Sequence, residues 1–162
     1  MRLAFVAVAA AGLALDQASK TLAMRNLDDG DIEVLGSWLV LHLTRNPGAA
    51  FSTGTQYTLL FSLLAIAAVV VVLYLSRRVG SLLWAIALGL LFAGVSGNLI
   101  DRVFRDPAPL RGHVVDFLMV PHWPVFNVAD ICINVAAGLI LVQAFRGIRI
   151  DGTRYSAREH QE

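Results

Sequence analysis

The chain has 162 residues, of which 57% are hydrophobic and only 15% are charged, and its formal net charge at pH 7 is +1. Soluble domains average roughly a quarter charged residues, so this composition excludes an ordinary soluble domain and indicates an integral membrane protein. The small net charge gives no reason to expect a nucleic-acid partner, and the single cysteine, Cys132, excludes an intrachain disulfide and a multi-thiolate metal site within one chain.

Four apolar stretches are long enough to cross a bilayer, which takes roughly 20 mostly apolar residues. They cover about residues 3–24, 58–75, 82–100 and 125–145. The second and third contain no charged residue, and the sequence has no internal repeat, low-complexity segment or linker. We therefore predict an all-α integral membrane fold with four transmembrane helices, formed as a single domain over residues 1–162.

The first span carries two charges, Asp16 and Lys20, one helical turn apart on the same face. A cleaved signal peptide is the alternative interpretation of this segment, since Arg2, an apolar run and Ala7-Val8-Ala9 fit that pattern. The apolar run before that site is very short, however, and apolar character resumes after Asp16 as far as Met24. This continuation favours a membrane span.

The first long loop shows strand-like alternation over residues 31–46, where Leu39, Leu41 and Leu43 alternate with other residues. The neighbouring Trp38 suits the headgroup zone of a membrane. A small extracytoplasmic sheet in this first outer loop is one prediction. An irregular interfacial loop anchored by Trp38 fits the pattern equally well.

The distribution of arginines predicts the orientation, because short cytoplasmic loops and ends carry an excess of basic residues. Arginines flank the N-terminus, the turn between the second and third spans, and the tail: Arg2, Arg77, Arg78, Arg146, Arg149, Arg154 and Arg158. The longer loops on the other side mix arginines with acidic residues. We therefore expect both termini in the cytoplasm.

With this orientation the unusual polar residues meet in the outer half of the membrane or just above it. They are Asp16, Lys20, Asn46, Asn98, Asp101, Arg102, Asp116, Asn127 and Asp130. Asp130 opens an almost uncharged run, and Asp116 precedes it in the adjoining outer loop. Two carboxylates that share one partly dry site differ in proton affinity, which leaves one acid and one base.

Each carboxylate also has a purely structural interpretation. Asp16 pairs with Lys20 in an intrahelical ion pair that neutralises two costly charges. Asp130, three residues after Asn127, fits a capping box at a helix start. Asp101 ends a helix where the dipole disfavours an anion, so it needs Arg102 or another partner, and Asp116 fits an ordinary loop acid. Their joint placement favours function.

Other catalytic groups have weaker support. Ser19 and Lys20 are sequence neighbours, so a helix points them in different directions and a Ser–Lys dyad is disfavoured. Cys132 fits a buried thiol better than a nucleophile. The four histidines form no i, i+4 pair and no His-Glu-x-x-His motif, so we expect no metal site.

Five motifs together resemble the signal peptidase II family, the lipoprotein signal peptidases of bacteria. They occur in order from the first span to the fourth: Asp16-Gln17-Ala18-Ser19-Lys20, Asn46-Pro47-Gly48-Ala49-Ala50-Phe51, Gly97-Asn98-Leu99-Ile100-Asp101-Arg102, Val114-Val115-Asp116-Phe117 and Phe126-Asn127-Val128-Ala129-Asp130. One such motif is weak evidence, whereas all five in order, with the four-span layout, are specific. The connection over residues 103–113 looks longer than is usual in the family, which leaves the shape of the outer rim open.

The resemblance implies an intramembrane aspartic endopeptidase of the bacterial cytoplasmic (inner) membrane, with no cofactor and its active site towards the outer face. The implied partners are prolipoproteins that carry a diacylglyceryl group, cut just before the lipidated cysteine, and membrane lipid; no obligate protein partner is evident. By motif, Asp116 and Asp130 are the catalytic pair. Residues matched to substrate contact and site organisation are Asn46, Arg102 and Asn127, and those matched to a supporting shell are Asp16, Lys20, Asn98 and Asp101.

Two other classes of function remain open from the residues alone. A small proton-coupled carrier would use Asp16, Asp101 and Asp130 as a relay. Carriers usually show repeated halves and polar groups near the midplane, neither of which we find here. A small structural or assembly subunit is the third possibility, and it leaves Asp116 unexplained.

Overall fold

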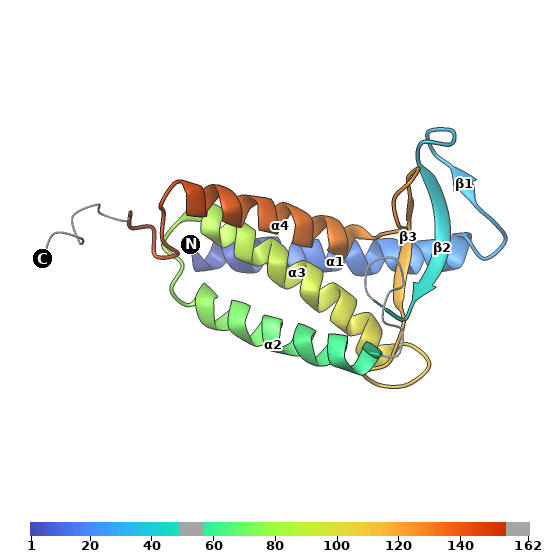
Figure 1. Cartoon of the computed structure of the whole chain (residues 1–162), viewed down its shortest axis with the longest axis horizontal. Coiled ribbons are helices and arrows are strands. Elements are labelled where there is room, and N and C mark those ends of the chain that lie inside the picture. Colours follow the sequence, from blue (N-terminus) through green and yellow to red (C-terminus); the bar gives the residue numbers. More distant parts are fainter. Residues whose placement is uncertain (49–56, 155–162) are drawn as a thin grey trace, which may run out of the picture.

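Four helices lie roughly side by side, and a small sheet crosses one end of the bundle (Figure 1). The structure is a computed structural model that describes residues 1–48 and 57–154. The helices are α1 (Arg2–Asn26), α2 (Thr58–Ser76), α3 (Leu82–Phe104) and α4 (Val128–Phe145), and each is long and apolar enough to cross a membrane. The prediction of four transmembrane helices is therefore confirmed. Residues 49–51 of the Asn46 motif and Arg158 of the basic tail lie outside the described residues.

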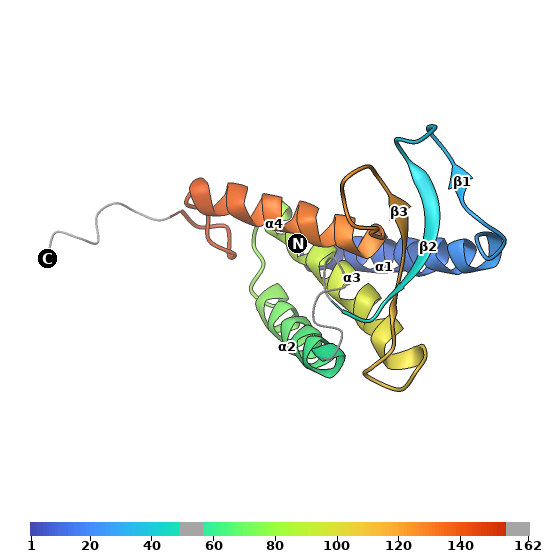
Figure 2. The same ribbon diagram turned by 45° about the vertical axis from the view of Figure 1, so that its right-hand side comes forward.

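Helix α3 is the axis of the bundle, because it packs against α1, α2 and α4, whereas α2 lies against α3 (Figure 2). Small residues allow this close packing. A Cβ atom on Gly94 would collide with the carbonyl oxygen of Ala129, and one on Gly97 would collide with the carboxylate of Asp16. The polar residues near the end of α3 are thereby brought between α1 and α4.

The sheet has three antiparallel strands in the order β1 (Ile32–Glu33), β2 (Val40–Asn46) and β3 (Val114–Met119). A sheet in the first loop was one of the two predictions for that segment, and it is confirmed. The sequence analysis did not predict that the second loop adds β3 to it. In the β2–β3 ladder, Asn46 pairs with Val114 and Thr44 pairs with Asp116.

The connection over residues 103–113 closes tightly onto α3, which continues one turn beyond its predicted end to Phe104. The Gly112 N–H donates to the Arg102 carbonyl at 2.9 Å, and the Ser62 hydroxyl of α2 donates to the Leu110 carbonyl at 2.6 Å. This connection thus joins the start of α2 to the end of α3 at the sheet end of the bundle.

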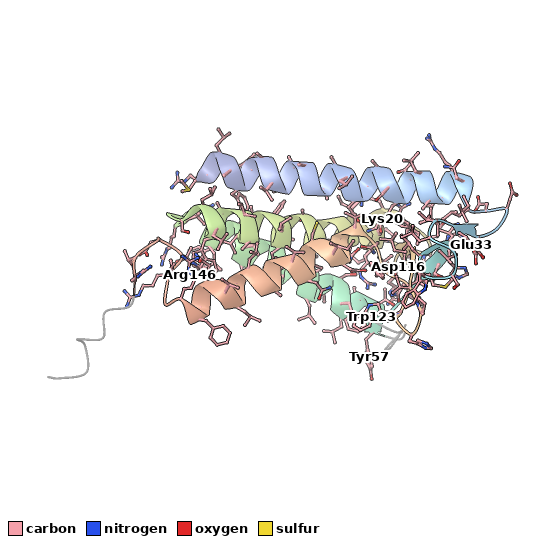
Figure 3. The ribbon with its side chains drawn as sticks, turned by 90° about the horizontal axis from the view of Figure 1, so that it is seen from above. Lys20, Glu33, Tyr57, Asp116, Trp123 and Arg146 are labelled. Atoms are coloured by element: carbon pink, nitrogen blue, oxygen red, sulfur yellow. The ribbon has the colours of Figure 1, made fainter. Side chains whose placement is uncertain are left out.

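The two ends of the bundle differ in character, as Figure 3 shows: Lys20, Glu33 and Asp116 lie at the sheet end, and Arg146 lies at the other. The N-terminus and the end of α4 also lie at that other end (Figure 1). There the segment after α4 folds back, since Trp84 donates to the Ile148 carbonyl at 3.0 Å. The four helices run the full distance between these two ends.

Candidate active site

A cavity of about 480 Å³ at the sheet end contains both predicted catalytic carboxylates, Asp116 and Asp130. Four other residues of the five motifs also line it: Asn46, Gly48, Asn98 and Arg102. Its remaining wall is largely apolar and comes from the β3–α4 connection and the first turns of α4. The cavity therefore has one polar wall, formed by these six residues and called the polar floor below, and one apolar wall.

Asp116 lies in the middle of β3 and is only 3% exposed. Its Oδ1 accepts a hydrogen bond of 2.6 Å from the Asn127 amide, and its Oδ2 accepts one of 3.0 Å from the Asn46 amide. Burial raises the pKa of Asp116 to about 6, and the negative charge of Asp130 raises it further against the two amide hydrogen bonds, which lower it. This carboxyl therefore holds a proton in weakly acidic solution.

Asp130 lies in the first turn of α4 and forms the predicted capping box with Asn127. The Asn127 side chain accepts from the Asp130 N–H at 3.0 Å, and Asp130 Oδ2 accepts from the Asn127 N–H at 3.1 Å. Asp130 Oδ1 accepts a third hydrogen bond, of 2.9 Å, from the Asn98 amide. The Asp130 side chain thus both caps α4 and lines the cavity.

The fully buried Asn127 contacts both carboxylates, because its side-chain amide donates to Asp116 and its backbone N–H donates to Asp130 Oδ2. Its Oδ1 faces the Asp130 N–H, and its Nδ2 faces Asp116. The same Nδ2 lies 3.2 Å from Asn98 Oδ1. The N-cap residue of α4 therefore sets the position of a strand carboxylate relative to a helix carboxylate.

Beneath this floor lies a completely buried ionic cluster centred on Lys20. The Lys20 ammonium lies 3.0 Å from Asp16 Oδ2 and 2.8 Å from Asp101 Oδ2, and it donates to Asn98 Oδ1 at 2.9 Å. The predicted Asp16–Lys20 pair is confirmed, but Lys20 is shared with a second carboxylate. Asp16 also accepts the Ala129 N–H at 2.9 Å, which ties α1 to the start of α4.

Asp101 finds its partners in Lys20 and Arg105 and not in Arg102. Arg105 Nε lies 2.6 Å from Asp101 Oδ1. The i, i+4 spacing of Asp101 and Arg105 is visible in the sequence and is the signal that was overlooked. Asp101 Oδ2 also accepts the Val115 N–H at 3.2 Å, which anchors β3 beside Asp116.

Arg102 lies in the wall of the cavity and is 7% exposed. One guanidinium nitrogen donates to the Gly48 carbonyl at 2.7 Å, and the guanidinium lies over the Phe61 ring at 5.7 Å. Its Nη1 has no hydrogen-bond partner among the described residues. An unsatisfied buried donor beside two carboxylates is suited to bind a ligand oxygen.

Comparison with known proteins decides the family. The model of the family described as signal peptidase (SPase) II matches residues 8–146. The chain belongs to the signal peptidase II family. Lipoprotein signal peptidases that it resembles include those of Mycobacterium leprae (45% identical, 90% of this chain and 73% of the relative) and Mycobacterium avium (44% identical, 97% and 88%).

A solved structure described as a bacterial membrane enzyme at 2.3 Å resolution superposes with a TM-score of 0.80. It is 25% identical, and the match covers 98% of this chain and 93% of that one. This signal peptidase is therefore a multi-pass bacterial membrane protein and a protease. Membership in the family favours the peptidase over the carrier and the structural subunit.

Two further residues of the peptidase line the cavity and were not predicted. Trp123, 62% exposed, stands in the β3–α4 connection at the rim (Figure 3). Asn134, one turn after Asp130, donates to the Asp130 carbonyl at 2.9 Å. An aromatic residue near a predicted membrane boundary was the available signal for Trp123.

Within residues 1–48 and 57–154, no group of three or more histidine, cysteine or acidic side chains could hold a metal ion. Cys132 is buried and is not among the residues that line the cavity. The functional groups that line the polar floor are carboxylates, amides and one guanidinium.

Proposed function

We propose that this signal peptidase is an aspartic endopeptidase that acts on prolipoproteins. Its substrate carries a diacylglyceryl group on the cysteine that follows the signal peptide, and the chain is cut just before that cysteine. The relatives named lipoprotein signal peptidases support the substrate class. The observation that carries the catalytic type is the pair Asp116 and Asp130 in one cavity, joined through Asn127.

The chemistry needs one ionised and one protonated carboxyl group. The ionised carboxylate takes a proton from a water molecule while the water oxygen attacks the scissile carbonyl carbon. The protonated partner donates to the carbonyl oxygen, so a tetrahedral intermediate forms. The carboxyl group that took the proton from water then gives it to the leaving nitrogen as the peptide C–N bond breaks. The hydroxyl group of the collapsing intermediate returns its proton to the other carboxylate, so the pair regains its starting state. The pKa of Asp116, raised to about 6, supports a pair that retains one proton in weakly acidic solution.

The neighbouring side chains hold this pair and the substrate. Asn46 and Asn127 donate to Asp116, and Asn98 donates to Asp130, so each carboxylate has a fixed orientation. The Arg102 Nη1 atom is available to a substrate carbonyl, because it has no partner among the described residues. Asp16, Lys20 and Asp101 support this layer from below.

The apolar wall suits a substrate whose signal helix and acyl chains both lie in the bilayer. Ile131 and Val135 of α4 line the cavity and are 43% and 47% exposed, so we expect this side of the helix to face lipid. A lipidated precursor can therefore reach the carboxylates from within the membrane, with membrane lipid as the surrounding medium.

The proposed orientation puts both termini in the cytoplasm and the sheet end at the outer face of the membrane. The arginines of the N-terminus, the α2–α3 turn and the segment after α4 support it, because all belong to the end opposite the sheet. The catalytic pair then lies within reach of precursors that have been exported.

Incubation of the purified protein with a diacylglyceryl-modified precursor tests the proposal. We expect a shorter product whose N-terminal residue, identified by mass spectrometry, is the lipidated cysteine. The same precursor without lipid serves as the control and should be cut far more slowly. A product with a different N-terminus, or equal cleavage of both precursors, would contradict the proposed substrate class.

A further inference from the structure

A second cavity, of about 270 Å³, lies at the sheet end on residues that the proposed mechanism does not use. It is lined by residues of α1, β2, the end of α3, the α3–β3 connection and β3. Its volume is many times the roughly 30 Å³ that one water molecule occupies in the liquid. It can therefore hold a group of several atoms.

The two cavities lie on opposite faces of the β2–β3 ladder. Successive side chains of a strand point to opposite faces. Asn46 and Asp116 line the catalytic cavity, whereas their neighbours Arg45 and Val115 line the second one. Arg45 and Val115 are paired residues in the register, so they sit side by side on that face. The second cavity is thus separate from the catalytic one.

The second cavity is lined by basic residues that keep donors for a further acceptor. Arg105 uses Nε for Asp101, but its Nη1 faces the Met24 sulfur at 3.1 Å, and a thioether is a weak acceptor. The side chains of Arg45 and His113 make no hydrogen bond or ion pair within residues 1–48 and 57–154. Two guanidiniums and an imidazole in one cavity are the groups that bind a phosphate.

One carboxylate, Asp106, lines the same cavity and makes no ion pair among the described residues. A purely anionic ligand would be repelled by this group. A ligand that carries both a phosphate and an ammonium matches the mixture of charges, because the ammonium can pair with Asp106.

The position of the cavity indicates a ligand from the membrane. It lies where α1 and α3 leave the predicted membrane region, at Met24 and Phe104. Phe104 is 81% exposed, so an apolar ring next to the basic groups faces the surroundings. An acyl chain would cover this ring while the headgroup occupies the cavity.

We propose that this cavity binds the headgroup of a zwitterionic phospholipid of the phosphoethanolamine class. The phosphate is held by Arg45, Arg105 and His113, the ammonium is held by Asp106, and the acyl chains pass Phe104. The proposal does not rest on the proposed substrate of the peptidase.

Native mass spectrometry of the protein in detergent tests this site with three probes: phosphatidylethanolamine, phosphatidylglycerol and water-soluble glycerophosphoethanolamine. We expect one phosphatidylethanolamine to be retained in preference to the other two. Arg45→Gln should weaken this binding about tenfold, as expected for the loss of a charged hydrogen bond. The matched control Arg111→Gln changes an exposed arginine of the same rim outside the cavity and should have no effect.

Asp106→Asn separates lipid selectivity from a folding defect. It removes the partner of the ammonium, so the preference should move from phosphatidylethanolamine towards phosphatidylglycerol, and unfolding cannot produce such a change in ratio. Three results overturn the proposal: equal lipid loss in Arg45→Gln and Arg111→Gln, an unchanged lipid ratio in Asp106→Asn, or glycerophosphoethanolamine binding as tightly as the lipid. The last result would assign the cavity to a soluble phosphate compound. No step of this test requires peptidase activity.

Discussion

The ammonium of Lys20 in α1 lies 2.8 Å from Oδ2 of Asp101 in α3, and both side chains are fully buried. The same ammonium contacts Asp16 and the Asn98 oxygen. Because the Asn98 oxygen faces the cation, its amide nitrogen is directed to Asp130. The charge cluster beneath the cavity therefore fixes the orientation of the Asn98 amide, which contacts the proposed catalytic carboxylate Asp130.

Lys20→Met should destabilise the protein more than Asp16→Asn. The methionine leaves two buried carboxylates without their cation, and breaking a buried pair costs about 3–5 kcal/mol. In Asp16→Asn, Lys20 keeps Asp101, and the asparagine oxygen can still accept the Ala129 N–H. Thermal unfolding in detergent measures the difference. Equal losses of stability, or a larger loss in Asp16→Asn, would contradict the shared-cation arrangement.

Asp116→Asn and Asp130→Asn should each lower the cleavage rate by at least about a hundredfold, because general acid–base catalysis contributes that much or more. Each substitution keeps the size of the side chain and one of the two hydrogen bonds that its oxygens accept, so expression and membrane insertion should stay near normal. The control is Asp29→Asn, an exposed residue of the first loop, which should cleave at the wild-type rate. Substantial turnover by either purified cavity variant would exclude that carboxylate from the chemistry.

Arg102→Lys should impair cleavage strongly although it keeps the positive charge. The guanidinium donates to the Gly48 carbonyl, lies over Phe61 and has a second, buried nitrogen without a hydrogen-bond partner among the described residues. An ammonium cannot reproduce this planar fork. Arg111→Lys, an exposed arginine, is the matched control. Steady-state kinetics with the lipidated precursor measure both; wild-type kcat/KM in Arg102→Lys would show that charge alone is sufficient.

The pH dependence of cleavage should report the Asp116 pKa of about 6. The Asn46 hydrogen bond lowers this pKa, so Asn46→Leu should move the corresponding limb of the kcat/KM profile to higher pH. A change in amplitude alone would reflect substrate binding, so the position of the limb is the quantity measured. A limb that stays in place or moves to lower pH would contradict the assignment.

The same pKa has a consequence for stability. The folded Asp116 keeps its proton up to about pH 6, whereas the ordinary value is 3.8. Between these values the folded state binds the proton more tightly than the unfolded state does, so stability should fall as pH rises through this window. Asp116→Asn should lack this component. Unfolding midpoints of both proteins from pH 4 to pH 7 provide the comparison.

Labelling of single cysteines should establish the orientation. With Cys132 changed to Ala, Glu33→Cys and Ala108→Cys at the sheet end should react with a membrane-impermeant thiol reagent added to intact cells. Arg78→Cys, an exposed position of the α2–α3 turn, should react only after the membrane is opened. Val79 and Gly80 are unsuitable positions, because Val79 is buried and a Cβ on Gly80 would collide with the Asp151 backbone. The inverse pattern would place the aspartates in the cytoplasm.

Much of this protein can be predicted from local sequence. The four spans follow from apolar length, since a helix is the simplest way to satisfy backbone groups in lipid. The Asn127–Asp130 capping box and the Asp16–Lys20 pair follow from i, i+3 and i, i+4 spacing, which fixes which side chains meet on one helix. The five motifs correctly indicated the family before any contact was known.

Tertiary structure alone decided how these local pieces meet. Lys20 pairs with Asp101 as well as with Asp16, because the close packing of α3 brings α1 and α3 together. Strand β3 joins the sheet of the first loop, because it pairs with β2. Sequence spacing carries no information on such contacts between elements. The same register places Asn46 and Asp116 on one face of the sheet and Arg45 and Val115 on the other. It thereby separates the proposed catalytic cavity from a second cavity that no motif indicated.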